Sequence, residues 1–69
     1  MNVLEKAHRK VIGTINNWLG LQHMECGNFK QALEFFMQSA DEENPSGTFN
    51  LGICHERGLG TSQNYKKVI

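Results

Sequence analysis

The clearest amphipathic helix in the sequence occupies residues 29–40, FKQALEFFMQSA. Its apolar side chains recur at steps of three and four, which places them on one face of a helix. They are Phe29, Ala32, Leu33, Phe36 and Ala40. Asn28 precedes this segment as an N-cap, and Gln31 follows three residues later, so the spacing predicts a capping box.

A longer helix is expected before it, over residues 3–25. Apolar residues again recur at helical steps and predict one buried stripe. They are Leu4, Ala7, Val11, Ile15, Trp18 and Leu19. Gly13 interrupts the segment and costs about 1 kcal/mol relative to Ala, so the segment is either one helix or two pieces hinged there; one helix with a weak point is favoured. Gly27 can adopt the left-handed conformation that ends a helix.

A third helix is expected from Pro45 to about Arg57. Asn44 is a good N-cap, and Pro suits the first helical position because its missing N–H is not needed there. Gly52 weakens this helix, and its expected use is close packing against a neighbour. The glycine-rich residues 58–64 form a loop, after which residues 65–69 could open a fourth helix. No run alternates with period two, so the predicted fold is all-α, built of antiparallel helix–turn–helix units.

Composition excludes several classes of function. The 69 residues carry 7 Lys and Arg against 7 Asp and Glu, so no net charge attracts nucleic acid or an anionic membrane. No run approaches the roughly 18 apolar residues of a membrane span, and the N-terminus lacks the pattern of a secretory signal. Two cysteines are few for a secreted disulfide scaffold. We therefore expect reduced thiols in an intracellular protein, with one bridge left open.

Metal binding and catalysis find little support. His23 with Cys26, and Cys54 with His55, offer zinc ligands of the correct types. Adjacent residues of a helix point about 100° apart, however, so Cys54 and His55 suit one metal ion poorly, and a zinc-binding module is a minor alternative. A Cys–His catalytic pair would need a third, orienting group that the sequence does not locate. We expect no enzyme activity, no cofactor and no metal.

An internal repeat accompanies these helices. Leu19-Gly20 recurs as Leu51-Gly52 after 32 residues, and His23 then falls on His55. In each pair the glycine would let a partner helix approach closely. After the first pair, Ala32 and Phe36 follow with Ala-x-x-x-Phe spacing: the small Ala admits a neighbouring helix and the Phe fills the gap one turn later.

These motifs, with Pro45, resemble the tetratricopeptide pattern. The second half is more similar to the SEL-one-like repeat, which favours an aromatic-Asn-Leu-Gly run, a Gly-x-Gly loop, Gln-Asp/Asn-Tyr and a lysine. The matching residues are Phe49-Asn50-Leu51-Gly52, Gly58-Leu59-Gly60, Gln63-Asn64-Tyr65 and Lys67. Trp18 departs from the pattern, since a tetratricopeptide places its Trp three residues before the Leu. The predicted organisation is a helical extension over residues 1–14, a full repeat over 15–44 and a truncated second repeat over 45–69.

The resemblance implies a scaffold that binds a peptide or partner helix on its concave face. The positions that would line this face are Asn17, Leu21, Met24, Phe49, Asn50, Ile53 and Glu56. None is Lys or Arg, so no clamp for a C-terminal carboxylate is expected. The alternative is a stacking or capping segment without a ligand. Fewer than three repeats leave apolar faces uncovered, which predicts either low folding cooperativity of the chain alone or self-association through the uncovered face. The run at residues 51–60 is also similar to repeats of a mitochondrial signalling protein, so a mitochondrial location stays open beside the cytoplasm.

Overall fold

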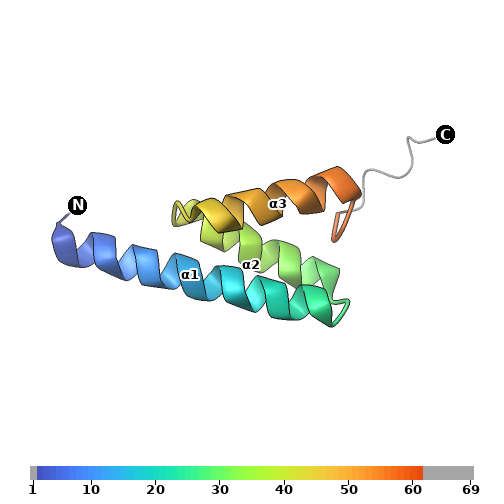
Figure 1. The fold of residues 1–69 in the computed structure, drawn as a ribbon, viewed down its shortest axis with the longest axis horizontal. Coiled ribbons are helices and arrows are strands. Elements are labelled where there is room, and N and C mark those ends of the chain that lie inside the picture. The colour runs from blue at the N-terminus through green and yellow to red at the C-terminus, as the bar shows by residue number, and fades with distance from the viewer. Residues whose placement is uncertain (1, 62–69) are drawn as a thin grey trace.

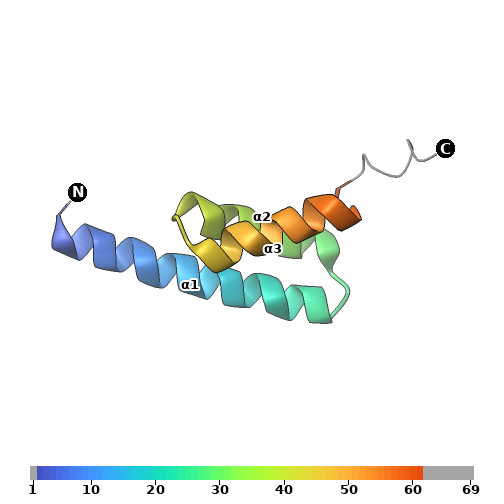
Figure 2. The ribbon, with the colours of Figure 1, turned by 45° about the horizontal axis from the view of Figure 1, so that its top comes forward.

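The computed structural model describes residues 2–61, which form three helices and no strand (Figure 1). The helices are α1 (Val3–Glu25), α2 (Phe29–Asp41) and α3 (Pro45–Arg57). Each helix runs antiparallel to the one before it, so α1 and α3 point in the same direction (Figures 1 and 2). The all-α prediction is confirmed, with helix bounds within one residue of those expected. The predicted fourth helix lies outside the described residues.

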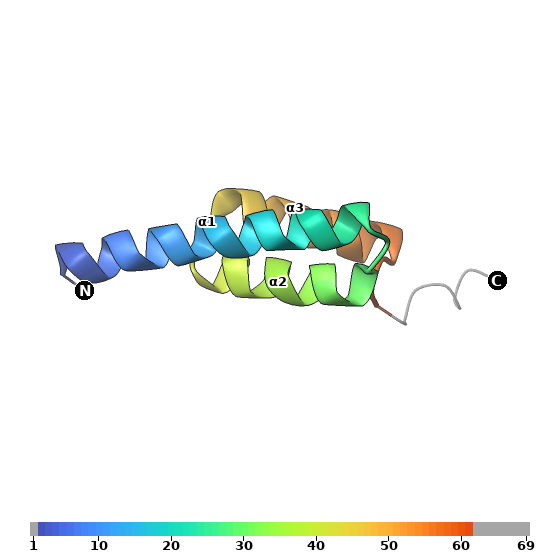
Figure 3. The same ribbon diagram turned by 90° about the horizontal axis from the view of Figure 1, so that it is seen from below.

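The first helix is continuous through Gly13 and is much longer than its neighbours. It has 23 residues against 13 in α2 and in α3, and its N-terminal part projects beyond both (Figure 3). A capping box starts it: the Asn2 side chain accepts from the Glu5 N–H at 2.8 Å, and the Glu5 carboxylate accepts from the Asn2 N–H at 3.2 Å. This box was not anticipated. The predicted boundary at residues 14 and 15 falls inside α1, and the division into repeats stays a prediction.

The turn between α1 and α2 confirms one expectation and corrects another. Gly27 has φ 79°, the predicted left-handed conformation. The capping box predicted at Asn28 is wrong, because the Asn28 side chain makes no cap hydrogen bond. Its backbone N–H, which Gln31 would have to accept, is donated to the His23 carbonyl at 2.9 Å. The C-terminal end of α1 therefore binds the Asn28 N–H that a capping box at the start of α2 would need.

The turn between α2 and α3 contains the cap that the sequence predicted. The Asn44 side chain accepts from the Gly47 N–H at 2.8 Å, and Pro45 takes the first helical position. Glu43 has φ 64°, a conformation that normally favours glycine. Its N–H donates to the Ala40 carbonyl at 2.8 Å, which satisfies one carbonyl at the end of α2.

The core lies along α2, which contacts both other helices. Ala32, Phe36 and Cys54 are fully buried and Leu33 nearly so. Phe36 packs onto Gly20 of α1: a Cβ added there would lie 2.6 Å from Phe36 Cδ1, closer than real Cβ contacts. The prediction that Gly20 admits its partner helix is therefore confirmed. Gly52 behaves differently, since nothing among the described residues lies within 4 Å of a Cβ added there.

Small residues also mark the crossing at the other end of α2. The buried Ser39 hydroxyl donates to the Gly13 carbonyl of α1 at 2.7 Å. On the α3 side, a Cβ added at Gly47 would lie 2.5 Å from Ser39 Cβ. Gly13 lies close to the turn between α2 and α3, because a Cβ added at Gly13 would lie 3.1 Å from Glu42 Cβ. The residue expected to weaken α1 is thus one of its packing points.

The apolar stripe predicted on α1 is present, but most of it is exposed. Leu4 is 77% exposed, Val11 55%, Ile15 46% and Trp18 56%. The residues of α1 that are buried are Gly13 and Gly20, on the opposite side of the helix. Close helix approach selects the side with small residues, which leaves the large apolar side chains facing outward.

Candidate protein-interaction surface

The seam between α1 and α3 is closed by two asparagines. The Asn50 amide donates to the Asn17 side-chain oxygen at 2.8 Å, and both residues are half-buried. The sequence analysis placed both on the predicted concave face. The structure brings them together, but it uses one donor and one acceptor for their mutual hydrogen bond. Their observed contact therefore fixes the spacing of the two parallel helices.

Two exposed apolar side chains flank this seam. Phe49 directly precedes Asn50 on α3 and is 68% exposed, and Leu21 lies one turn beyond Asn17 on α1 and is 38% exposed. Figure 2 shows α1 and α3 side by side with α2 behind them. Leu21 and Phe49 are thus the apolar groups most available to a partner on this side.

The other predicted lining residues contribute less contact area. Met24 packs against the buried core and is only half-exposed, and Ile53 is also half-buried. Glu56 is exposed on the last turn of α3, where it adds a negative charge at one end of the surface. We refer below to Leu21, Phe49 and the asparagine pair between them as the seam surface.

Arg9 makes a contact that the sequence did not predict. Its Nε donates to Glu42 Oε1 at 2.9 Å, and its Nη2 donates to the Asp41 carbonyl at 2.6 Å. The hydrogen bond to Glu42 raises the pKa of the Arg9 guanidinium, and nearby acidic charges add to the effect. The cation also suits the negative end of the α2 dipole. Arg9 therefore joins α1 to the end of α2.

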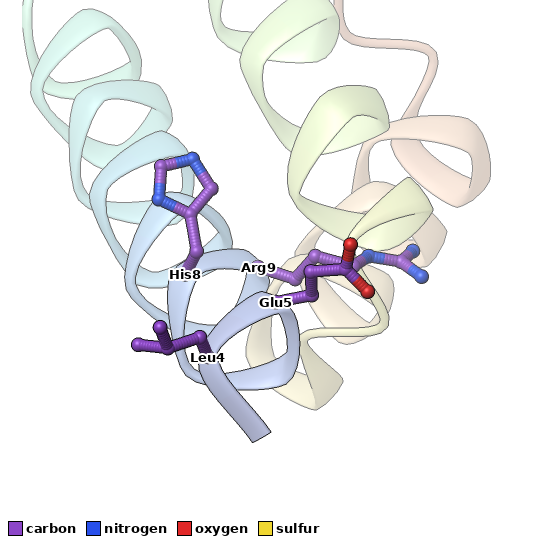
Figure 4. A pocket seen from close by; sticks show the side chains of 4 residues that line it. All are labelled: Leu4, Glu5, His8 and Arg9. Atoms are coloured by element: carbon purple, nitrogen blue, oxygen red, sulfur yellow. The ribbon is translucent and has the colours of Figure 1, made fainter. Parts of the chain in front are cut away.

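A shallow hollow lies beside this contact on the projecting part of α1. It is lined by Leu4, Glu5, His8 and Arg9. Figure 4 shows Glu5 and Arg9 directed toward the turn after α2, with Leu4 and His8 on the other side of the helix. All four residues come from one helix, so the hollow is a surface feature and not a cleft between elements.

The histidines and cysteines are dispersed. The His23 ring stacks on the Phe35 ring of α2, with centroids 5.3 Å apart, whereas His55, which falls on His23 in the repeat, is exposed. Both cysteines are free thiols; Cys26 is exposed, and burial raises the pKa of the Cys54 thiol. Among residues 2–61 no group of three or more His, Cys, Asp or Glu side chains could hold a metal ion.

The fold and this surface define an all-helical chain whose packing is compatible with helical hairpin repeats. No protein-family model matches it, and no solved structure matches. The chain is 32% identical over 53 residues to mouse DAP3-binding cell death enhancer 1, and 30% identical over 53 residues to the rat protein; each match covers 77% of this chain and 10% of the relative.

A third relative is a plant protein. The chain is 36% identical over 39 residues to the Arabidopsis thaliana ERAD-associated E3 ubiquitin-protein ligase component HRD3B, which is a SEL-one-like repeat protein. That match covers 56% of this chain and 6% of the relative. The chain thus spans about a tenth or less of the length of these relatives. In the described part of the chain, no helix has the length and apolar character needed to cross a membrane.

Proposed function

We propose that this chain is a protein-interaction segment, and not an enzyme, and that it holds a peptide or helix of its partner on the seam surface. The observation that supports this most is the exposure of Phe49, which is 68% exposed on α3 beside the Asn17–Asn50 hydrogen bond. Large aromatic side chains held on a rigid surface are common anchors of protein interfaces.

The seam surface favours an apolar ligand with few charges. Leu21 and Phe49 project from two parallel helices whose spacing the Asn17–Asn50 hydrogen bond maintains. No cation lies among the seven positions predicted to line this face, and Glu56 is the one acid. An amphipathic helix or an extended apolar peptide fits this chemistry, with any basic residue of the ligand at the Glu56 end.

The name of the mouse and rat relatives supplies a defined probe, because those proteins are described as DAP3-binding. We propose DAP3, or a protein with the same binding segment, as the partner of the seam surface. The cytoplasmic or mitochondrial location stays a prediction.

Binding of purified DAP3, followed by calorimetric titration, tests this proposal. Leu21→Ala combined with Phe49→Ala should weaken binding at least about tenfold while leaving the melting temperature nearly unchanged, since both side chains are exposed. Met37→Ala is the matched control, because Met37 is 48% exposed but lies on α2. Met24→Ala would be a poor probe, since Met24 packs on the core.

Two outcomes would contradict the proposal. If the unaltered chain does not bind DAP3 at about 100 µM, DAP3 is not the partner. If the double variant binds as tightly as the unaltered chain, the seam surface is not the binding face. If the chain is a stacking segment without a ligand, the Leu21→Ala/Phe49→Ala double variant and the Met37→Ala control should differ from the unaltered chain only in stability.

A further inference from the structure

The outward side of α1 carries a continuous apolar stripe that no described residue covers. We call it the outer stripe; it consists of Leu4, Ala7, Val11, Ile15 and Trp18, and all five residues are exposed. Their spacing of three and four follows one side of the helix. The stripe lies opposite Gly13 and Gly20, through which α1 packs onto the rest of the fold. It is therefore a second, separate face of the same helix.

The sequence around the stripe is unusual for a surface helix. Residues 11–22, VIGTINNWLGLQ, contain no charged side chain on any side of α1. The outer face of a surface helix normally carries charged and polar side chains, whereas the outer stripe in this segment is apolar and exposed. The central three turns of α1 thus have the composition of a helix covered on both faces.

The length of the stripe indicates what covers it. The N-terminal part of α1 projects beyond α2 and α3 (Figure 3), and the stripe extends toward that end as far as residue 4, so it is longer than a 13-residue helix such as α2. The occupant needs a long helix with an apolar side and no opposing charges. The helix with these properties in the described chain is α1 itself.

We propose that the outer stripe is an interface for a second copy of this chain, formed by two α1 helices packed side by side. The predicted self-association then has a defined location. From the exposed fractions of its side chains, the stripe offers roughly 500 Å² per copy, so a pair buries on the order of 1,000 Å², near the lower limit for a specific interface. An interface so close to the lower limit predicts a weak, reversible dimer.

Electrostatics favours an antiparallel pair. Lys6 and Lys10 lie near the N-terminal end of α1, and a parallel pair would bring this end of both copies together; Arg9 is already paired with Glu42. An antiparallel pair separates the lysines and also opposes the two helix dipoles favourably. In heptad spacing this arrangement sets Val11 against Ile15 of the other copy and Trp18 against His8 of the other copy.

Sedimentation of the 69-residue chain from about 5 to about 300 µM tests the interface. The mass should rise from 7.8 kDa toward twice that value. Ile15→Lys should raise the dissociation constant at least tenfold, because it buries an unpaired charge. Met37→Lys is the control: Met37 is 48% exposed and Ile15 46%. A chain that remains monomeric throughout, or an Ile15→Lys variant that keeps its helical spectrum and associates normally, would overturn the proposal.

Disulfide trapping tests the orientation. Thr14 flanks the outer stripe near its middle and is exposed. In an antiparallel pair the two Thr14 residues meet, whereas a parallel pair places them on opposite sides of the contact. In a Cys26→Ser background, Thr14→Cys should form a disulfide dimer rapidly under mild oxidation. Glu34→Cys, exposed on α2, reports random collision. Equal rates for the two variants would overturn the antiparallel arrangement.

Discussion

Gly20 and Gly52 occupy the same place in a repeated Leu-Gly motif, yet their surroundings differ. Gly20 lies under the Phe36 ring, while the described chain leaves open space beside Gly52. A glycine at this position therefore allows a neighbouring helix to approach closely. Whether a helix does approach depends on the rest of the chain. Among the described residues, α2 covers α1 at Gly20, whereas the corresponding side of α3 at Gly52 is uncovered.

The largest change in the free energy of unfolding should come from Gly20→Ala. The added methyl group would meet the Phe36 ring, and overpacking of this kind costs about 1–3 kcal/mol. We expect a value near the upper end, because Phe36 is fully buried. In a domain of this size such a loss is a large share of the free energy of unfolding. Urea unfolding followed by circular dichroism measures it.

A second substitution checks the cause. Phe36→Leu removes the part of the ring that approaches Gly20, so it should cost less in the Gly20→Ala background than in the unaltered chain. Strictly additive effects would mean that the two residues are not in contact.

The next effect compares the two turns. Asn44→Ala should lower the free energy of unfolding by about 1 kcal/mol, because the Asn44 side chain accepts the Gly47 N–H. Asn28→Ala should change it by less than about 0.5 kcal/mol, since no cap hydrogen bond is lost. Urea unfolding of both variants tests this difference. Equal losses of unfolding free energy would indicate that Asn28 also forms a capping box.

The smallest expected effect is a stabilisation. Gly52→Ala should raise the free energy of unfolding by about 0.5–1 kcal/mol, because alanine favours a helix over glycine and open space surrounds the site. Thermal melting of the 69-residue chain is sufficient to detect it. A destabilised variant would show that another segment packs on Gly52 as Phe36 packs on Gly20.

Local chemistry made the helices predictable. Pro45 with Asn44 fixed the start of α3, Gly27 ended α1, and the apolar spacing at residues 29–40 defined α2. The contact of Gly20 was also predictable, because Phe36 follows it at the spacing that a paired helix requires. Each of these signals depends on a few neighbouring residues.

The side on which α1 is buried was not predictable in the same way. Its large apolar residues favoured one side, but Gly13 and Gly20 permit a closer approach on the other. Periodicity shows that a stripe exists and does not show which neighbour covers it. Asn28 was misinterpreted for a related reason, since its N–H serves the end of the preceding helix.

The candidate surface was predicted in part. The sequence placed Asn17 and Asn50 on one face, and the structure brings them within hydrogen-bond distance. The sequence did not indicate that these two asparagines bind each other, nor that Arg9 contacts Glu42. Such contacts depend on how the helices cross, which no local motif specifies.

Nuclear Overhauser contacts between the Gly20 Hα protons and the Phe36 ring protons test most directly whether α1 and α2 pair through a residue without a side chain. The structure predicts strong cross-peaks, together with Gly20 Hα shifts displaced by the ring current. Their absence in a sample whose helices are formed would contradict this packing, and with it the seam surface that α1 and α3 build upon α2.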